Sequence, residues 1–297
     1  MNTSFSALQK MRRIAETIES IIHQDPGNRG LNKWAVKGDL LLSALELLKG
    51  NHIVIGTGFY ILTSGVIETD GPPGAIVLAS ALRSLNKKIS LVVDDHSESI
   101  MKEGLKALDC DAELILLPVD KPVKAAAVLT DATTHFVALE RPGKAKDGNC
   151  YNFRGEDISL HVASLDDVFI HAAENGIRTI GIGDGGNEIG MGRVATDVEK
   201  HVAPGRPFAC VTKADLCICA GVSNWAGYGL AAMLSRITGK NLMAESSKLI
   251  KLVEAIVEAG AVDGVTGKNE PTVDGLAFSW EQKTYSEMFG FAEKSML

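Results

Sequence analysis

The stretch that decides the fold reads Thr179-Ile180-Gly181-Ile182-Gly183-Asp184-Gly185-Gly186-Asn187-Glu188-Ile189-Gly190-Met191-Gly192. An apolar run leads into a segment rich in glycine, which adopts backbone angles that a β-carbon forbids and lets main-chain N–H groups approach a ligand. Asp184, Asn187 and Glu188 supply the strongly polar side chains of this segment. The pattern predicts a strand, a tight turn and the start of a helix, which is where an open α/β sheet places its ligand site.

Short apolar runs alternate with helical patterns along most of the remaining chain. Such alternation is typical of a mostly parallel sheet with helices on both faces. We therefore predict an α/β fold with a single doubly wound sheet, and one domain over residues 1–297 with the N-terminal helices of residues 1–50 packed on it. The expected strands are 53–55, 89–93, 113–117, 136–139, 177–182 and 216–220, and the expected helices are 4–24, 36–49, 74–86, 97–108, 121–131, 164–175, 226–238, 246–259 and 279–294.

The start of one helix and the long polar stretch before it carry further expectations. The helix over 164–175 is expected to begin at a cap formed by Ser164-Leu165-Asp166-Asp167, because serine and aspartate side chains accept hydrogen bonds from the first N–H groups of a helix. The polar stretch over 141–163 is long for a connection inside a compact domain, and such loops are usually functional or disordered.

Composition limits the classes of partner. The 297 residues are 45% hydrophobic and 23% charged, with a formal net charge of −7, which argues against nucleic acid or an anionic membrane as the main partner. No apolar run approaches the ~20 residues that cross a bilayer, and no targeting segment is recognisable, so we predict a cytoplasmic protein. A homo-oligomer is compatible with the sequence.

The five cysteines lack the spacing of a zinc finger. Cys217 and Cys219 lie two residues apart in an expected strand, so both point to the same face. A metal-binding pair is conceivable, but two small buried hydrophobic side chains are the favoured interpretation. The odd number favours a reducing compartment.

Polar clusters follow the expected strands at their carboxyl ends. Parallel strands bring these ends to one edge of the sheet, so the clusters are expected to meet in one crevice. They are Glu68-Thr69-Asp70-Gly71, Asp94-Asp95-His96, Glu140-Arg141 with Asp147 and Arg154, Asp184 with Glu188, and Ser223-Asn224.

The glycine-rich stretch permits three interpretations. Residues 181–186 match the spacing of a dinucleotide fingerprint, but Asp184 and Glu188 would repel a pyrophosphate. Carboxylates in a glycine loop favour a cation, either a substrate ammonium group or Mg²⁺ or Mn²⁺ held by Asp184 and Glu188. The third interpretation is a helix N-terminus with acidic caps.

The other clusters also have structural alternatives. Glu68 and Asp70 either serve the site or cap the turn that follows them, and Ser223 is interpreted as a ligand-binding hydroxyl, because the sequence around it lacks the nucleophile elbow. Arg154 lies in a loop, where a guanidinium group is a natural holder of a carboxylate. Arg141 either does the same or is a turn residue.

Taken together, the motifs resemble the D-glutamate cyclase family, specifically its C-terminal domain, from about residue 30 to residue 280. The segments that carry the resemblance are Gly56-Thr57-Gly58-Phe59, Glu68-Thr69-Asp70-Gly71-Pro72-Pro73-Gly74-Ala75, Glu140-Arg141-Pro142-Gly143, Asp147-Gly148 with Asn152-Phe153-Arg154-Gly155, residues 183–192, and Gly221-Val222-Ser223-Asn224-Trp225-Ala226-Gly227-Tyr228. The resemblance implies a lyase of the hydro-lyase type that converts D-glutamate to 5-oxo-D-proline and water.

We assign roles to residues as hypotheses about that reaction. Arg154 anchors the α-carboxylate, Asp184 or Glu188 takes the proton of the ammonium group with Glu68 as second choice, and loop N–H groups, Asn187 or a divalent ion stabilise the charge on the γ-carboxyl group. Substitution of Asp184 by asparagine is expected to remove most turnover with little loss of stability. The remaining expected substrate-binding residues are Thr57, Gly58, Asp70, Gly183, Gly185, Gly186, Ser223 and Asn224.

Two other functions remain open at this point. One is a non-catalytic module that binds an amino acid or its lactam, because the resemblance also implies that the animal enzymes join this domain to a hydro-lyase-like domain, which would then act as a separate partner. The other is a metal-dependent phosphohydrolase, for which phosphate-binding basic residues at the strand ends are scarce.

Overall fold

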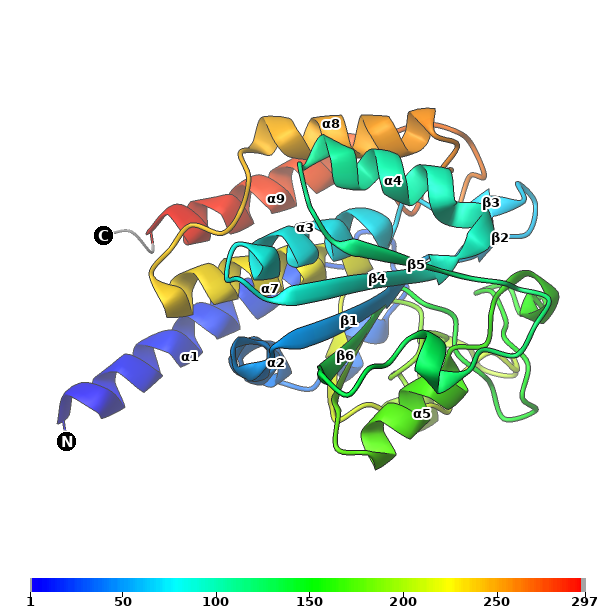
Figure 1. Ribbon diagram of the computed structural model, residues 1–297, viewed down its shortest axis with the longest axis horizontal. Coiled ribbons are helices and arrows are strands. Elements are labelled where there is room, and N and C mark those ends of the chain that lie inside the picture. The colour runs from blue at the N-terminus through cyan, green and yellow to red at the C-terminus, as the bar shows by residue number, and fades with distance from the viewer. Residues whose placement is uncertain (1, 295–297) are drawn as a thin grey trace.

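The computed structural model describes residues 2–294, and its centre is a parallel sheet (Figure 1). Each strand is a short, mostly apolar run, and most of its residues are buried, as expected for a sheet covered on both faces, except in the edge strand β5, where only Leu117 is buried. In the described chain the order across the sheet is β5-β4-β1-β6-β7-β8. The strands are β1 His52–Thr57, β4 Lys88–Asp94, β5 Glu113–Leu117, β6 Thr133–Leu139, β7 Arg178–Gly183 and β8 Leu216–Cys219.

The strand order makes the sheet doubly wound. The chain starts at β1 in the middle, proceeds outward through β4 to β5, returns to β6 on the other side of β1, and continues outward through β7 to β8. The direction of winding therefore reverses between β1 and β6. Ligands of open α/β sheets bind outside the carboxyl ends of the strands at such a reversal.

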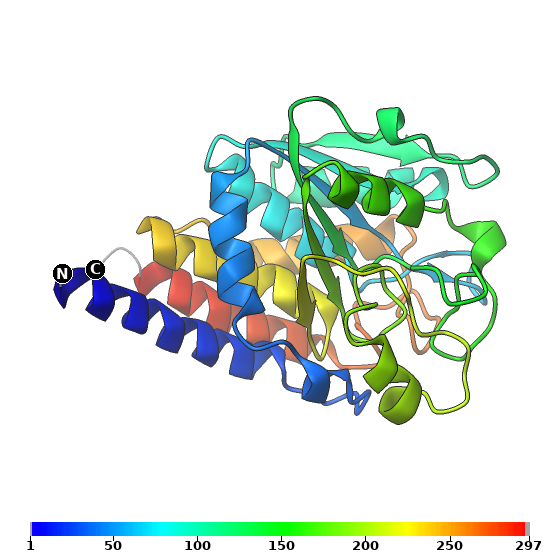
Figure 2. The ribbon, with the colours of Figure 1, turned by 90° about the horizontal axis from the view of Figure 1, so that it is seen from below.

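Helices cover both faces, but unequally (Figures 1 and 2). Along β1, Ile53 and Ile55 point into a large core, and Val54 points into a smaller core that it shares with Phe169. The large core is formed with α1 Asn2–Ile22, α2 Asp39–Lys49, α3 Pro72–Arg83, α4 Glu98–Ala107, α7 Ser223–Thr238, α8 Ser246–Glu258 and α9 Phe278–Glu293, and the smaller core with α5 Asp166–Glu174.

The N-terminal helices α1 and α2 both pack on α7. Their apolar residues, among them Ile18, Ile22, Leu40 and Ala44, belong to the large core. Helix α1 also contacts α9. The fold class predicted from the sequence is confirmed.

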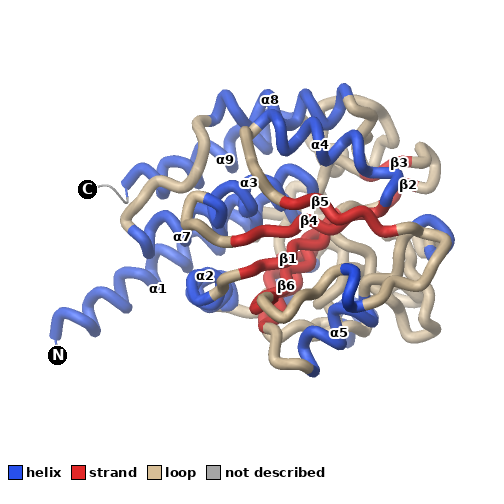
Figure 3. Tube along the Cα trace, viewed as in Figure 1, coloured by secondary structure: helices blue, strands red, loops and turns tan. Residues whose placement is uncertain are grey.

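A small hairpin precedes the site and was not predicted. Strands β2 Tyr60–Ile61 and β3 Val66–Ile67 pair antiparallel between β1 and α3, and the tube in Figure 3 shows the pair beside the carboxyl end of the sheet. Two residues per strand are too short for the alternation of apolar side chains to be recognised. The hairpin positions Glu68 and Asp70.

The prediction of a helix over residues 121–131 was wrong. This segment contains only a short 3₁₀ helix, Ala125–Ala127, and Val128 is its single buried side chain. A helix without an apolar face to bury gains too little from packing to offset its nucleation. The remaining short helices are the 3₁₀ turns Leu31–Trp34, Asp95–Ser97 and Ser159–His161, α6 Ala195–Asp197 and the π-helical turn Val198–Val202.

Two local predictions were also wrong. The glycine-rich stretch does not enter a helix, because the next helical residue is Ala195, and residues 184–192 form turns and bridges instead. The hydroxyl of Ser164 makes no hydrogen bond, and α5 starts at Asp166 without a side-chain cap. The Asp166 carboxylate accepts hydrogen bonds from the backbone N–H of Lys144 and the hydroxyl of Thr212.

The long polar loop over 141–163 is ordered by a buried ion pair. Arg141 donates two hydrogen bonds to the carboxylate of Asp94, at 2.6 and 2.7 Å, and a third to the carbonyl of Ala163. The backbone N–H of Ala163 in turn donates to Asp94. Both ends of the loop are thereby fixed to the carboxyl end of β4.

Cys217 and Cys219 lie on the same face of β8, as predicted. Their sulfur atoms are 4.0 Å apart and both contact the sulfur of Met191 inside a small core. All five cysteines are free thiols. None of the helices in residues 2–294 is long and apolar enough to span a membrane.

Candidate active site

The reversal point between β1 and β6 opens into a cavity of about 290 Å³. This volume lies at the lower end of the roughly 300–1,000 Å³ typical of small-molecule sites. Apolar side chains from the hairpin and the 141–163 loop form part of its wall, and a few polar groups converge on it. The lining residues that matter here are Arg29, Phe59, Glu68, Glu140, Phe153, Arg154 and Asn187.

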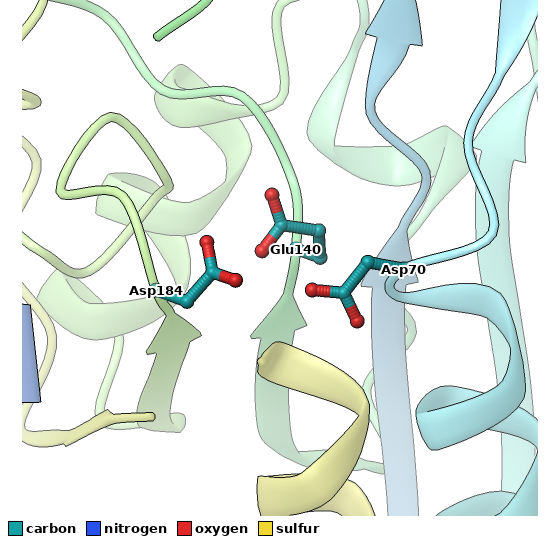
Figure 4. Close-up of side chains that lie close together, drawn as sticks. All are labelled: Asp70, Glu140 and Asp184. Atoms are coloured by element: carbon teal, nitrogen blue, oxygen red, sulfur yellow. The ribbon is translucent and has the colours of Figure 1, made fainter. Parts of the chain in front are cut away.

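Three buried carboxylates meet beside this cavity, and one of them, Glu140, is part of its wall. Asp70 follows the hairpin, Glu140 follows β6 and Asp184 follows β7. One carboxylate oxygen from each lies within 4.8 Å of the others. Figure 4 shows the three side chains pointing toward one another from three separate segments. Their meeting confirms that strand ends distant in sequence converge, as the parallel sheet requires.

Asp70 is held by helix N-termini. Its two oxygens accept hydrogen bonds from the backbone N–H groups of Gly71, Ser223 and Asn224, at 2.8–2.9 Å. Ser223 and Asn224 are the first residues of α7, where free N–H groups and the helix dipole favour a negative charge. Burial nevertheless raises the pKa of Asp70 to about 7, against the lowering effect of these hydrogen bonds.

Asn224 serves the packing of α3 on α7. Its side-chain oxygen accepts from the N–H groups of Gly71 and Gly74, and its nitrogen donates to the carbonyl of Thr69. Gly74 and Gly227 face each other so closely that a Cβ on Gly227 would stand 2.5 Å from the Gly74 carbonyl oxygen. The polar atoms of Asn224, expected to bind substrate, are thus engaged within the protein.

Glu140 has an unusual backbone. Its φ is +47°, a left-handed conformation that residues with side chains rarely adopt. The hydroxyl of Ser223 donates to its carboxylate at 2.5 Å, and a Cβ on Gly71 would stand 2.8 Å from the Cβ of Glu140. Strained conformations cluster at functional sites, because the surrounding structure must enforce them. Here the strain directs the carboxylate toward Asp70 and Asp184.

The glycine-rich loop wraps around the carboxylate of Glu188. One oxygen of Glu188 accepts from the N–H groups of Asp184 and Gly185, and the other from that of Gly186, at 2.7–3.1 Å. A Cβ on Gly183 would collide with the same carboxylate. The loop therefore uses its glycines to surround a side chain of its own, which explains the match to a phosphate-binding pattern without a phosphate.

Asp184 shares an arginine with a second aspartate. Arg29 donates one hydrogen bond to Asp184 and one to Asp274. The second oxygens of Asp184 and Asp274 are buried and make no hydrogen bond in the described chain. Although burial opposes it, the charges of Asp184 and Asp274 raise the pKa of Arg29, so it remains a cation.

Glu68 faces the cavity. Its side chain is 5% exposed, and its carboxylate accepts no hydrogen bond from residues 2–294. Burial raises the pKa of Glu68, and the neighbouring Asp274 and Asp70 raise it further. Burial likewise raises the pKa values of Glu140, Asp184 and Glu188. A carboxylate whose pKa is raised is a stronger base, which suits acid–base chemistry.

The remaining sequence-predicted residues lie around this centre. Arg154 is exposed at the mouth of the cavity, where it donates to the carbonyl of Val265 at 3.3 Å. Asn187 lines the wall and donates to the carbonyl of Tyr151. Thr57 ends β1 and its buried hydroxyl has no partner among the described residues, and Gly58 follows with φ +99°.

Sequence reasoning missed Arg29 and Asp274 as members of the site. Arg29 follows Asp25-Pro26-Gly27, which indicated only the end of a helix, and Asp274 lies in the irregular segment between α8 and α9. Neither follows a strand of the sheet, so nothing in their local pattern pointed to the cavity. Glu140 was visible as a strand-end residue, and its position directly after β6 was the available signal.

Comparison with known proteins agrees with this geometry. Residues 18–289 match the family described as D-glutamate cyclase-like, C-terminal. A human protein named D-glutamate cyclase, mitochondrial, is 34% identical over an alignment 324 positions long, which covers 96% of this chain and 52% of that protein. This chain thus spans about half the length of that relative. Because the name of the relative says mitochondrial, a cytoplasmic location of this chain stays a prediction. Because both matches extend over nearly the whole chain, the protein belongs to the D-glutamate cyclase-like C-terminal domain family.

Proposed function

We propose that this chain catalyses the intramolecular condensation of D-glutamate to 5-oxo-D-proline and water. Family membership and the name of the human relative support the substrate and the reaction. One structural observation carries the proposal: the cavity brings Glu68, whose carboxylate has no hydrogen-bond partner, together with Arg154, which forms no ion pair in residues 2–294. An amino dicarboxylic acid has a complementary ammonium group and carboxylates.

Arg154 is the proposed anchor of the α-carboxylate. Guanidinium groups bind carboxylates in a planar, two-pronged geometry. Arg29, the other arginine of the cavity wall, already contacts two aspartates, so Arg154 is the better candidate. Its place at the mouth would orient the rest of the substrate toward the buried carboxylates.

Glu68 is the proposed general base. Ring closure requires that the substrate ammonium group lose a proton before its nitrogen attacks the γ-carboxyl carbon. The new C–N bond replaces a C–O bond, and the two protons that the nitrogen loses in total pass to the departing oxygen, which leaves as water. Glu188 is occupied by three backbone N–H groups and Asp184 by Arg29. Among the acids expected from the sequence, Glu68 is therefore the best placed to accept a proton.

Asn187 is the proposed partner of the γ-carboxyl group. Its side chain lines the cavity and keeps one amide hydrogen beyond the bond to Tyr151. The loop N–H groups of Gly185 and Gly186, considered for this task from the sequence, donate to Glu188 instead. A cavity that holds the substrate folded also gains rate from orientation alone.

The test is an assay of the purified chain with D-glutamate and, separately, L-glutamate, with and without Mn²⁺ or Mg²⁺, followed by chiral chromatography for 5-oxoproline. The proposal predicts product from the D-isomer. If no product forms while D-glutamate or 5-oxo-D-proline still raises the melting temperature, the chain is a binding module whose chemistry lies elsewhere.

A further inference from the structure

The Asp70–Glu140–Asp184 cluster has the composition and size of a site for a hard divalent cation. Mg²⁺ and Mn²⁺ prefer carboxylate oxygens, and two oxygens on opposite sides of an octahedral Mg²⁺ are about 4.2 Å apart. One oxygen of each carboxylate already lies within 4.8 Å of the other two. Small rotations of the side chains would therefore place all three oxygens around one ion.

Unpartnered polar atoms point independently to a ligand at this place. The second oxygen of Asp184 is fully buried without a hydrogen bond, and Figure 4 shows this side chain directed toward Glu140 and Asp70. The hydroxyl of Thr57, outside the acidic cluster, is also fully buried without a partner. The point where a Cβ on Gly71 would stand lies 2.9 Å from this hydroxyl and 2.8 Å from the Cβ of Glu140, so the hydroxyl borders the cluster.

The number of acids around the cluster also favours a bound cation. Glu68, Asp70, Glu140, Asp184 and Asp274 are all buried, and in the described chain Arg29 is the one cation that pairs with any of them. Buried carboxylates are paired, protonated or bound to metal, because an isolated buried charge is very unfavourable. A dianionic substrate such as glutamate would meet strong repulsion here unless a cation neutralised part of this charge.

Glu188 is not part of the cluster, although the sequence suggested it as a ligand beside Asp184. Both of its oxygens are engaged by backbone N–H groups. Glu140, by contrast, contributes to the cluster and to the cavity wall. An ion bound by the cluster would therefore be reachable from the cavity through Glu140.

We propose that Asp70, Glu140 and Asp184 bind one Mg²⁺ or Mn²⁺ ion beside the cavity, at the point where Glu140 joins the cluster to the cavity wall. The ion site stands on the geometry alone, and its task of receiving a substrate carboxylate rests on the proposed function. Arg29 would hold Asp184 in place through one carboxylate oxygen and leave the other for the ion.

Direct ion binding tests this site. The full chain, stripped with a chelator, is titrated with Mn²⁺ and free Mn²⁺ is followed by electron paramagnetic resonance. We expect one saturable ion per chain, and a loss of affinity of at least about tenfold in Asp184→Asn and in Glu140→Gln. Asp166→Asn is the matched control, because Asp166 is an equally buried acid outside the cluster, and it should bind Mn²⁺ as the wild type does.

The wild-type chain alone keeps the proposal falsifiable if a variant fails to fold. Because a ligand of the native state stabilises it by mass action, Mn²⁺ should raise the melting temperature of the stripped wild type. No saturable Mn²⁺ binding, or equal binding by Asp184→Asn, would overturn the site. Product from a stripped chain that binds no ion would refute the ion site and leave the proposed function intact, and ion binding without product would do the reverse.

Discussion

Two arginines at the carboxyl edge of the sheet, the buried Arg141 and the half-buried Arg29, bind aspartates in different ways. Arg141 makes two hydrogen bonds to the single carboxylate of Asp94, which also accepts one from the backbone of Ala163. Arg29 divides its two hydrogen bonds between Asp184 and Asp274, and each of these leaves one buried oxygen without a partner. Both oxygens of Asp94 are therefore engaged, whereas Asp184 and Asp274 each keep one oxygen without a partner in the described chain.

This difference separates a structural ion pair from one that belongs to a ligand site. A buried carboxylate with every oxygen engaged has no capacity for substrate or metal, and its removal leaves an uncompensated charge. A buried carboxylate with an open oxygen is unfavourable unless a ligand completes it. Four predictions follow. They test whether changes at the Arg141–Asp94 pair lower stability, whereas changes at residues of the cavity lower activity.

The largest effect is expected from the open carboxylate of Glu68. Substitution Glu68→Gln keeps the size of the side chain and removes the base, so kcat for 5-oxo-D-proline formation should fall by about 10²–10⁴-fold. The unfolding midpoint in urea should change little, because this carboxylate makes no hydrogen bond in residues 2–294. Glu19→Gln, at another buried glutamate on α1, is the matched control, and equal rates for the two variants would remove Glu68 from the mechanism.

Substitutions in the Arg141–Asp94 pair are expected to lower the stability of the fold. Arg141→Met leaves Asp94 buried and charged, and breaking such a pair costs about 3–5 kcal/mol of unfolding free energy, measurable by urea denaturation. The double variant Arg141→Met with Asp94→Asn should recover part of this loss, because no uncompensated charge remains. An Arg141→Met protein of wild-type stability would contradict the assignment of this pair to structure.

Arg154 should act on substrate binding with little effect on folding. Its guanidinium is exposed and makes one long hydrogen bond, so Arg154→Gln should leave the melting temperature nearly unchanged. Loss of a charge-assisted contact of about 1.5–3 kcal/mol should raise KM for D-glutamate roughly 10–100-fold. A variant with unchanged KM would place the α-carboxylate elsewhere in the cavity.

The smallest effect concerns Glu281, a buried acid with no arginine beside it. Burial raises its pKa to about 8, with a further contribution from Asp70, while Trp225 donates a hydrogen bond to it. The folded protein keeps the proton and the unfolded chain releases it above its ordinary pKa of 4.5. The stabilisation from Glu281 is therefore complete below pH 4.5 and is lost as the pH rises toward about 8.

Unfolding free energies of wild type and Glu281→Gln between pH 5 and pH 8 provide the measurement. The glutamine does not titrate, so the wild type should lose stability relative to the variant by at most about 1.4 kcal/mol per pH unit. A difference that stays constant over this range would show that Glu281 does not keep its proton in the folded state.

Most of the fold was predictable because its signals are local. Apolar runs such as the one around Ile53 marked all six strands of the described sheet, and the helical periodicities marked the long helices. The failures occurred where a local pattern lacked tertiary support. Residues 121–131 have helical composition but only Val128 to bury, and β2 and β3 are too short to show a period.

The candidate site was predictable only in part. Asp70, Glu140 and Asp184 were expected to meet at the carboxyl edge of the sheet, and for Glu140 and Asp184, which follow the neighbouring strands β6 and β7, the topology of a parallel sheet is sufficient. The sequence did not predict which of these carboxylates keeps an oxygen without a hydrogen-bond partner. Glu188 and Asp184 lie in the same loop and look equivalent in the sequence, but the backbone folds around one and leaves the other for Arg29.

The sequence by itself therefore determined the strands and most helices, the family, and the edge of the sheet where the polar clusters lie. Each of these depends on periodicity and motifs within short segments of the chain. The tertiary structure alone decided the partners of each buried charge. Arg29 and Asp274 are separated by 245 residues and meet through one hydrogen bond. Such a contact depends on the packing of whole helices, and no local pattern records it.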